Sequence, residues 1–400
     1  MKYNFDEIID RTNTNSMNVD GWRHYIFKDD PHREFPFADN EFIRMWVADM
    51  EFAVAPEIRE AIKERVDRQI LGYSAVTDPE YYEAVFEWCK TRYDLTFPKR
   101  HLVFSQGVVP ALYQLVEDLV GAGEKVITFT PAYGYFLHAC EYSGTGLLES
   151  PLASRSGRYE IDFDDLEKKA ADPSARMLIL CNPHNPTGTV WSREELERVA
   201  GIAARNGLWI ISDEIHCDLL RTGLRHTPMA NIMPDYDRLI TCMSASKSFN
   251  LAGMMHSHII IRNEEERARF RSRDKTGGAL NPLSIAAHKA AYSRGAQWLD
   301  ALRSYLDDNF RFTGEFLAEN IPDAGFSVPD ATYFAWVDFS KVLPDEKSLP
   351  LFFAERAGVL LEGGNELFVG NAEGCVRLNL AMPRAMLKTG LERMAGSVAH

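Results

Sequence analysis

The sequence lacks paired cysteines, an excess of basic residues and low-complexity tracts. Its six cysteines are scattered with no C-x-x-C pair, so we expect reduced packing residues and neither a disulfide framework nor a metal site. The 44 Lys and Arg residues are outnumbered by 58 Asp and Glu residues, which gives a formal net charge of -14. Since nucleic-acid phosphates are bound by clustered Lys and Arg, this balance argues against nucleic acid as a partner.

Long hydrophobic runs are also missing. Residues 1–10 contain acidic side chains where a signal peptide has its apolar core, and no run elsewhere is long enough to span a bilayer. We therefore expect a cytoplasmic protein without a membrane partner.

What the chain does have is length and apolar content. Its 400 residues, 46% of them hydrophobic, can bury a large core and exceed a usual single domain, so two domains are expected. Short apolar runs alternate with amphipathic helical patterns, which predicts a mostly parallel sheet covered by helices on both faces. The predicted strands are residues 101–105, 125–130, 177–181, 208–211 and 239–243.

Three patterns predict individual helices. An apolar stripe at helical spacing predicts one helix, and the capping box Ser192-x-x-Glu195 predicts the start of another. The stripe consists of Tyr82, Val85, Phe86, Cys89 and Tyr93. A third helix begins after the 101–105 strand, where Gly107-Val108-Val109 leads into Pro110, a residue suited to a first helical turn. Because such a start leaves backbone N–H groups unpaired at the positive end of the helix dipole, we expect a phosphate group to bind there.

Polar residues directly follow three of the predicted strands. The strands at 177–181, 208–211 and 239–243 lead, in that order, to Asn185, Asp213 and Lys247. The carboxyl ends of parallel strands share one edge of a sheet, so these three side chains should lie together. An amine for an aldehyde, a carboxylate for a ring nitrogen and a donor for a ring oxygen are the groups that pyridoxal phosphate requires.

With these motifs the chain resembles the fold-type I pyridoxal-phosphate enzymes of the class I/II aminotransferase superfamily. Within them it is similar to the C-S β-lyase subgroup, which includes cystathionine β-lyases of the cystalysin type. The resemblance covers nearly the whole chain, and the order and spacing of its motifs are specific. They are Trp46-Val-Ala-Asp-Met-Glu-Phe52, Gly72-Tyr73, Gly107-Val-Val-Pro110, Pro131-Ala-Tyr133, Asn182-Pro-His-Asn-Pro-Thr-Gly188, Ser212-Asp-Glu-Ile-His-Cys-Asp218, Ser244-Ala-Ser-Lys-Ser-Phe-Asn-Leu-Ala-Gly253, Ala331-Thr-Tyr-Phe-Ala-Trp336 and Val376-Arg-Leu-Asn379.

The resemblance implies an aspartate-aminotransferase-like α/β fold. A large domain, residues 49–287, should hold a mostly parallel seven-stranded sheet between helices. A smaller α/β domain should comprise residues 288–400 together with an N-terminal arm, residues 1–48.

The resemblance also implies roles for individual residues. Lys247 should bind the cofactor covalently and move the substrate proton, and Asp213 should keep the ring nitrogen protonated. Substrate contacts are implied for Arg377, which should clamp the α-carboxylate, and for Ala48 and Asn185. The remaining cofactor contacts should be the phosphate-binding Val108, Val109, Ser244 and Ser246, the ring-stacking Tyr133, Asn185 at the phenolic oxygen, and Tyr73, which should reach the neighbouring subunit's phosphate in a homodimer.

His216 has two interpretations. Ordinary aminotransferases of this fold commonly have a tyrosine three residues after the aspartate, whereas this chain has His216-x-Asp218, as the C-S lyases do. The histidine could contact the cofactor, or it could simply be packed at the end of a strand.

Several positions depart from the subgroup. Leu367-Phe-Val-Gly370 stands where the subgroup usually has Phe-Gly, Glu362 adds an acid nearby, and Gly253-Met-Met-His256 is bulky. These departures bear on the choice of substrate more than on the chemistry.

The function expected from these residues is a C-S β-lyase. It would cleave cystathionine, cysteine or related β-thio amino acids by α,β-elimination to a thiol, pyruvate and ammonia. An aminotransferase on the same fold is the alternative, although His216 and the arm motif favour elimination. A serine acyl-transfer enzyme is a rival from another class, since Ser244-x-x-Lys247 and Lys275-Thr-Gly277 match two of its motifs, but the S-D-N motif between them is missing. A noncatalytic interaction protein is disfavoured because the expected functional residues are all present.

Overall fold

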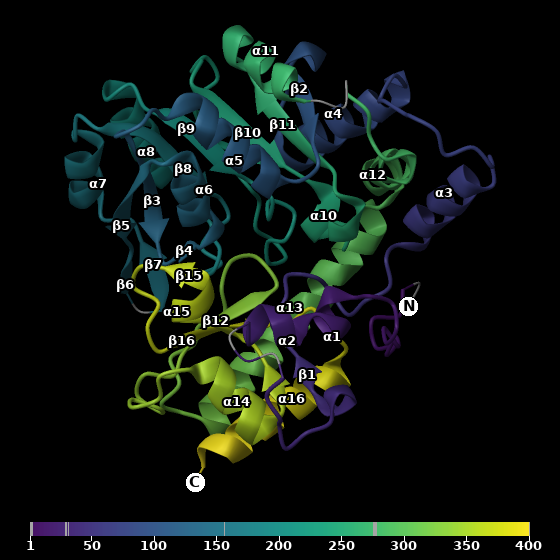
Figure 1. Ribbon diagram of the computed structural model, residues 1–400, viewed down its shortest axis with the longest axis vertical. Helices are drawn as coiled ribbons and strands as arrows, with labels where there is room; N and C mark the ends of the chain where they lie inside the picture. Colours follow the sequence, from purple (N-terminus) through teal and green to yellow (C-terminus); the bar gives the residue numbers. More distant parts are fainter. Residues whose placement is uncertain (1–2, 29, 31, 156, 275–277, 400) are drawn as a thin grey trace.

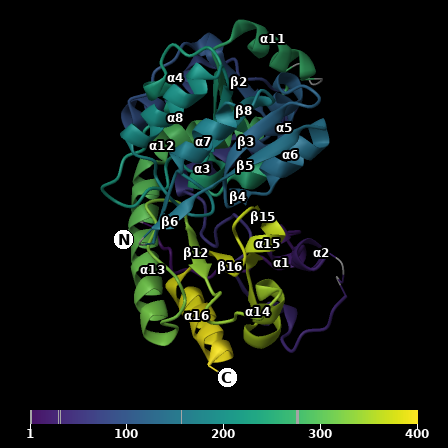
Figure 2. The same ribbon diagram turned by 90° about the vertical axis from the view of Figure 1, so that its left-hand side faces the viewer.

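The computed structural model describes residues 3–28, 30, 32–155, 157–274 and 278–399. Two lobes are visible in Figure 1. The large lobe is built around a seven-stranded sheet, and the small lobe around a three-stranded one. Helix α13, Ala296–Asn320, runs from the helices of the large lobe along the side of the small lobe (Figure 2). The domain boundaries expected at residues 48 and 287 stay a prediction.

The sheet of the large lobe has the expected architecture. Its strand order is β2-β11-β10-β9-β8-β3-β5, and every strand is parallel to the others except β11, which runs antiparallel to both neighbours. The strands are β2 Leu102–Ser105, β3 Lys125–Thr130, β5 Gly146–Pro151, β8 Ala175–Cys181, β9 Trp209–Asp213, β10 Leu239–Met243 and β11 Ser257–Ile261.

Alternate residues of each strand pack on opposite faces of this sheet. In β8, Met177 and Ile179 join a core layer with one set of helices, while Leu178 and Leu180 join the layer on the other side. The first layer contains α5 Val108–Leu119, α6 Tyr135–Ser143 and α11 Glu264–Arg273. The second contains α3 Pro56–Val66, α4 Pro79–Tyr93, α7 Phe163–Ala170, α8 Arg193–Arg205, α9 Met229–Ile232, α12 Pro282–Arg294 and α13. Strands buried on both faces explain why their sequences read as continuous apolar runs.

Local signals placed most of these elements correctly, with small shifts. The capping box of α8 is present, since the Ser192 hydroxyl accepts a hydrogen bond from the Glu195 N–H at 3.1 Å. Helix α5 begins at Val108, two residues before Pro110. In α4, Val85, Cys89 and Tyr93 of the predicted stripe are buried, whereas Tyr82 and Phe86 are only half-buried, so the buried face is centred slightly to one side of the predicted one.

The small lobe combines C-terminal strands with the N-terminal arm. The antiparallel order is β12-β16-β14, formed by Phe334–Asp338, Cys375–Asn379 and Glu362–Gly363, and it packs against α14 Leu349–Ala357 and α16 Arg384–Val398. The arm joins through β1 Ile43–Arg44, which pairs in parallel with β13 Val359–Leu360. Its other elements are α1 Met17–Asp20, α2 Trp22–Ile26 and the 3-10 turn Asp39–Glu41.

Short elements complete the fold, and one pair of strands joins the two lobes. Strand β15 Phe368–Val369 of the small lobe pairs antiparallel with β4 Ala132–Tyr133 of the large lobe. The others are β6 Ala153–Arg155, β7 Arg158–Glu160, α10 Ala245–Ser248, α15 Gly364–Leu367 and the 3-10 turns Lys99–His101 and Ala252–Met254.

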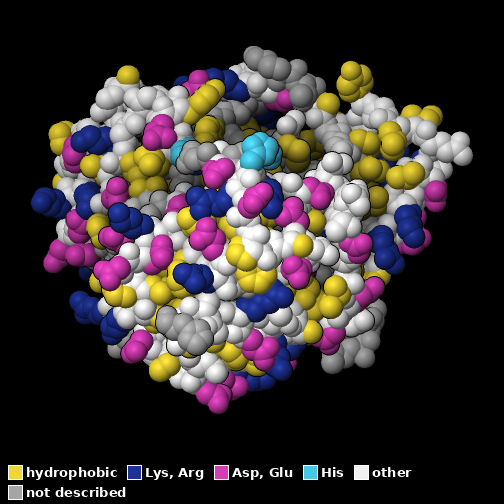
Figure 3. All heavy atoms as spheres, turned by 60° about the horizontal axis from the view of Figure 1, so that its bottom comes forward, with side chains coloured by type: hydrophobic (Ala, Val, Ile, Leu, Met, Phe, Trp, Pro, Cys, Tyr) yellow, Lys and Arg dark blue, Asp and Glu magenta, His cyan; other side chains and the backbone are white. Residues whose placement is uncertain are grey.

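The surface and the cysteines agree with the composition. On the face drawn in Figure 3, Lys and Arg side chains lie scattered among Asp and Glu side chains. All six cysteines are buried and unpaired, which confirms them as packing residues. Within the described part of the chain, no helix has the length and apolar character that crossing a membrane requires.

Candidate active site

The polar residues that follow β8, β9 and β10 converge on one cavity of about 230 Å³. Cys181, Asp213 and Cys242 are neighbours in register at the carboxyl ends of these strands. Of the predicted site residues, those that line the cavity are Ala48, Val108, Val109, Tyr133, Asn185, Asp213, His216, Ser246, Lys247 and Arg377. The two that do not are Ser244 and Tyr73.

Lys247 lies on the short helix α10 and points its amine at the backbone of another segment. Its Nζ donates a hydrogen bond to the carbonyl oxygen of Ala48 at 2.9 Å. Burial, with a further contribution from the nearby Arg377 guanidinium, lowers the pKa of Lys247 to about 8. An amine with this pKa is far more nucleophilic near neutral pH than an exposed lysine, because a larger fraction is unprotonated.

Asp213 is the last residue of β9, which extends two positions beyond the strand end expected from sequence. Its Oδ1 accepts a hydrogen bond from the Ile215 N–H at 3.2 Å. Burial raises the pKa of this carboxyl to about 7. A buried carboxylate of this kind is stabilised in its charged form by a cationic group in the cavity.

Arg377 forms another wall of the cavity, from β16. Its Nη1 donates to Asn185 Oδ1 at 3.3 Å and its Nη2 to the carbonyl of Trp46 at 3.2 Å, while its Nε is buried without a partner. The guanidinium lies over the ring of Phe334 at 4.0 Å. Burial lowers its pKa, and no ion pair to Arg377 occurs among the described residues. A buried guanidinium with spare donors is suited to bind an incoming carboxylate.

The first turn of α5 forms the opposite end of the cavity. Val108 and Val109 line it from the helix start, and Ser246 lines it from α10. Ser244 supports this end from behind: its hydroxyl accepts from the Ser246 N–H at 3.0 Å and donates to the carbonyl of His256 at 2.7 Å. The helix dipole and the free N–H groups make this the end where an anion is favoured.

His216 and Tyr133 occupy the remaining walls. His216 is buried near the rings of Tyr333 and Phe334, with ring centroids 6.3 and 5.8 Å away, and its Nδ1 has no hydrogen-bond partner. Burial holds its pKa well below the usual range. Tyr133 stacks on Tyr135 with centroids 5.0 Å apart. Both predicted residues therefore face the cavity, and their contacts with a cofactor stay a prediction.

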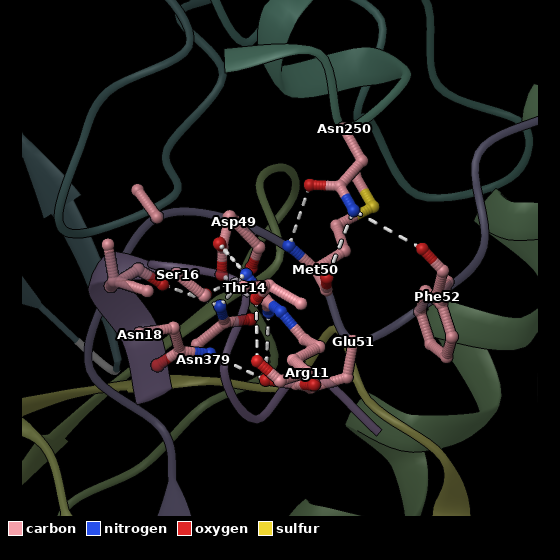
Figure 4. A network of polar contacts seen from close by, with 12 residues as sticks. Arg11, Thr14, Ser16, Asn18, Asp49, Met50, Glu51, Phe52, Asn250 and Asn379 are labelled. Atoms are coloured by element: carbon pink, nitrogen blue, oxygen red, sulfur yellow. Dashed lines mark hydrogen bonds and ion pairs between the residues drawn. The ribbon is translucent and has the colours of Figure 1, made fainter. Parts of the chain in front are cut away.

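Sequence reasoning noted residues 46–52 as a motif but missed that two asparagines hold this backbone strap in place. Asn250, three residues after Lys247, bonds through its side chain to the N–H and carbonyl of Met50 at 3.0 and 2.9 Å. Asn379, two residues after Arg377, donates to the carbonyls of Val47 and Asp49 at 2.7 and 2.5 Å. Figure 4 shows both asparagines with the strap. The one local signal is Asn250 itself, whose left-handed φ of 56° is a conformation that Asn tolerates.

The N-terminal arm also contacts the strap, through ion pairs and a hydrogen bond to its acidic side chains. The Arg11 guanidinium pairs with Asp49 at 2.6 Å and Glu51 at 3.1 Å, and the Asn18 amide donates to Glu51 at 2.5 Å (Figure 4). Tyr333 adds a hydrogen bond from its hydroxyl to the Ala48 carbonyl at 2.9 Å. The carbonyl that receives Lys247 is thus held on several sides.

Asp218, the acid of His216-x-Asp218, stabilises the short helix that contains Lys247. Its carboxylate accepts from the Ser248 hydroxyl at 2.7 Å, from the Trp88 indole at 3.2 Å and from the Tyr93 hydroxyl. Because Ser248 directly follows Lys247, this buried carboxylate fixes the turn that presents the lysine.

The features of the serine acyl-transfer rival are not brought together. The Ser244 hydroxyl donates to the His256 carbonyl and caps α10, where the rival would need it to face Lys247. The Lys275-Thr-Gly277 match lies outside the described residues. Tyr73 is fully exposed in the loop between α3 and α4, so it does not enter the cavity of its own chain.

Comparisons with known proteins agree with this geometry. The family model for aminotransferase class I and II matches residues 40–394. A cystathionine beta-lyase, PatB, of Bacillus subtilis is 39% identical over 91% of this chain and 94% of its own. Protein MalY of Escherichia coli is 32% identical over 90% of this chain and 93% of its own.

Solved structures give the same result. The pyridoxal-phosphate-bound C-S lyase from Staphylococcus hominis has 46% identity and a TM-score of 0.94, covering 100% of this chain and 98% of that one. Cystalysin from Treponema denticola, which contains a pyridoxal 5'-phosphate cofactor, has 33% identity and a TM-score of 0.91, covering 100% and 99%. The chain therefore belongs to the aminotransferase class I and II family and has the fold-type I architecture that its sequence motifs predicted.

Proposed function

We propose that this protein is a pyridoxal-phosphate-dependent C-S β-lyase that cleaves cystathionine, cysteine or related β-thio amino acids to a thiol, pyruvate and ammonia. The observation that carries the proposal is the shared cavity, in which a buried amine, a buried carboxylate and an unpaired guanidinium face one another. The relatives named as carbon-sulfur lyases along nearly the whole chain support the same reaction.

The donor set of the cavity fits the cofactor. Lys247 supplies an amine with a lowered pKa for the aldehyde, and Asp213 supplies a buried carboxylate for the ring nitrogen. The start of α5 supplies backbone donors for the phosphate. When bound, pyridoxal phosphate supplies an electron sink for charge that develops at the substrate Cα.

The side chains of this chain then have distinct tasks. Arg377 and Asn185 hold the substrate carboxylate, which fixes the direction of the Cα–H bond. Lys247 Nζ accepts the Cα proton, while the Ala48 carbonyl and the Ser248–Asp218 contact keep its amine in place. The Cβ–S bond breaks with its electron pair on sulfur, and the thiolate leaves. The enamine that remains hydrolyses to pyruvate and ammonia.

An aminotransferase is the alternative, and one assay distinguishes the two. Purified protein with pyridoxal phosphate and cystathionine, without any keto acid, should form pyruvate continuously and in equal amount to the thiol product. An absolute requirement for a keto acid, with no pyruvate formed from any β-thio amino acid, would establish transamination instead.

A second cavity, of about 620 Å³, bears on which β-thio amino acids the protein prefers as substrates. Tyr135 and Glu362 line it, whereas Tyr133 and Arg377 line the first cavity. The Tyr133 and Tyr135 rings stack, and Glu362 lies directly opposite Arg377 in the β14–β16 ladder. One layer of side chains therefore separates the two cavities.

Glu362 is an unusual acid in that layer. It is 6% exposed, and among the described residues no hydrogen bond or ion pair reaches its carboxylate. Burial raises its pKa to about 7, and Arg377 opposes that shift. A buried carboxylate without a partner is suited to an ammonium group on the ligand. We infer that substrates whose leaving thiol has an ammonium group, as cystathionine has, are favoured over simple S-alkyl cysteines.

The substitution Glu362→Gln tests this preference. It should lower kcat/KM for cystathionine by about 10- to 100-fold, the usual range for a hydrogen bond to a charged group, and leave S-methylcysteine unchanged. Glu366→Gln is the matched control, since Glu366 lines the same cavity but bonds Ser348 at 3.1 Å. Equal effects on both substrates would refute the preference.

We also propose a homodimer in which Tyr73 serves the partner's site. The segment before it is unusually apolar for a surface, with Ile70 75% and Leu71 53% exposed beside the fully exposed Tyr73. Sedimentation should give a dimer mass, and Tyr73→Ala should weaken cofactor binding. The cytoplasmic location expected from the sequence stays a prediction.

A further inference from the structure

A cluster of buried rings lies behind the α5 end of the cavity. Tyr81 contacts two histidines through its hydroxyl, His256 Nε2 at 2.6 Å and His258 Nε2 at 2.8 Å. His288 lies against His256, with ring centroids 4.6 Å apart. Within the described residues, no group of His, Cys, Asp and Glu side chains is arranged to hold a metal ion, so the cluster needs another explanation.

His256 is the member that reaches the cavity. It lines the cavity wall and is 1% exposed, and its Nδ1 is buried without a hydrogen-bond partner while its Nε2 is engaged by Tyr81. A buried polar atom normally has a partner, and leaving one unpaired costs roughly 1–3 kcal/mol. His258 Nδ1 and His288 Nε2 of the same cluster are unpartnered too, but of these three histidines only His256 lines the cavity, so its Nδ1 points to a ligand atom.

Neighbouring contacts place His256 at the anion end. Its ring stacks on Phe104 of β2, with centroids 5.3 Å apart, and β2 leads directly into the first turn of α5. Its carbonyl accepts the Ser244 hydroxyl. Two other basic side chains of the cavity donate elsewhere, Lys247 to Ala48 and Arg377 to Asn185, and His216 packs beside Tyr333 and Phe334.

We propose that His256 Nδ1–H donates a hydrogen bond to the cofactor phosphate and that Tyr81 and His258 set the proton on that nitrogen. The inference rests on the proposed function for the presence of pyridoxal phosphate. No other described basic side chain of this cavity lies at the α5 end, so His256 adds a donor to the backbone N–H groups and Ser246.

Because the Tyr81 hydroxyl has a single hydrogen, it can donate to only one of the two histidines and must accept from the other. The position of the proton on His256 therefore determines its position on His258. Burial and the neighbouring imidazoles hold the pKa values of His256 and His258 well below the usual range, so each ring has one N–H. A donor at His256 Nδ1 requires a bare Nε2, which must accept the Tyr81 hydrogen. The Tyr81 oxygen then accepts from His258 Nε2–H, and the unpartnered His258 Nδ1 is the bare nitrogen that ends this chain of hydrogen bonds.

Two substitutions separate a phosphate contact from a structural role. In His256→Asn the amide N–H lies near the position of Nδ1, whereas in His256→Gln it lies near that of Nε2 and keeps the Tyr81 contact. Affinities of the apo protein for pyridoxal phosphate and for pyridoxal, which has no phosphate, are measured by absorbance titration. We expect His256→Gln to weaken pyridoxal phosphate by about 10- to 100-fold, His256→Asn to stay close to the parent, and pyridoxal to be unaffected in both.

Other outcomes overturn the proposal. Unchanged phosphate affinity in His256→Gln, the reverse order of the two variants, or equal losses for pyridoxal would each do so. Should either variant fail to fold, ¹⁵N-histidine spectra of the wild-type holoprotein decide: a protonated Nδ1 on His256 supports the proposal, and a protonated Nε2 refutes it. If the wild-type protein binds no pyridoxal phosphate at all, the proposed function fails first.

Discussion

The amine of Lys247 and the carbonyl of Ala48, 199 residues apart in sequence, meet in a hydrogen bond of 2.9 Å. The same carbonyl also accepts the Tyr333 hydroxyl. Ala48 was expected to contact substrate, and its backbone proves to hold the proposed catalytic amine as well. The lysine amine is thus oriented by the backbone of a distant segment, which restricts the positions from which it can react.

Replacing Lys247 tests the centre of the proposal. Lys247→Ala should remove both the covalent attachment and the group that moves the Cα proton, with a loss in kcat of at least about 100- to 10,000-fold. The visible absorption of the lysine-bound cofactor should vanish as well. Near-normal turnover together with an intact absorption band would contradict the assignment.

Asp213→Asn should abolish most activity while the protein stays folded. The amide keeps the shape of the carboxylate but not the charge that favours a protonated ring nitrogen. Cofactor should remain bound through its phosphate. Steady-state kinetics and the cofactor spectrum are the measurements, and an unchanged kcat would exclude Asp213 as the partner of the ring.

The raised pKa of Asp213 predicts that the apo protein gains stability from the same substitution. Since the folded pKa is about 7 and the ordinary pKa of an aspartate is 3.8, the folded protein binds the extra proton between these values, and stability falls as pH rises through that window. Apo Asp213→Asn should therefore have a higher Tm than the apo parent at about pH 8, with the difference disappearing near about pH 4. A pH-independent difference would argue against this titration.

Arg377→Ala should weaken substrate binding and leave the cofactor spectrum normal. A charge-assisted contact to the α-carboxylate contributes about 1.5–3 kcal/mol. An amino acid substrate should lose affinity strongly, while its decarboxylated amine should bind the mutant and the parent alike. Equal losses for the two ligands would mean that Arg377 supports the fold instead.

Asn250 should matter for turnover although it does not line the cavity. Asn250→Ala and Asn250→Gly both remove the side-chain bonds to Met50 and Phe52, but only glycine tolerates the φ of 56° without strain. If the strap orients Lys247, both variants should lower kcat by about 10- to 100-fold with the cofactor still bound. Asn320→Ala, an exposed asparagine on α13, is the control. A defect in Asn250→Ala alone would indicate backbone strain as the cause.

The sequence predicted the parts of the fold that local patterns determine. Strands β3 and β10 have the expected bounds, because fully buried strands are continuous apolar runs with polar ends. Pro110 lies in the first turn of α5, as expected, because a proline there gives up no intrahelical hydrogen bond. The residues expected at the sheet edge do line one cavity because parallel strands place their carboxyl ends together.

What the sequence did not predict depends on contacts between distant segments. Asn379 reaches Val47 across 332 positions, and Tyr333 reaches Ala48 across 285. Neither residue differs locally from an ordinary strand or loop residue. His256 had been noted only as part of a bulky departure, and its contact with Tyr81 becomes visible once α4 packs on the sheet.

The strap has one more consequence, for how the two lobes can move. Asn250 of the large lobe and Asn379 of the small lobe both donate hydrogen bonds to its backbone carbonyls. A rotation of one lobe against the other would strain the hydrogen bonds that Asn250 or Asn379 makes to the strap. Because the Ala48 carbonyl belongs to this strap, the position of the Lys247 amine depends on both lobes.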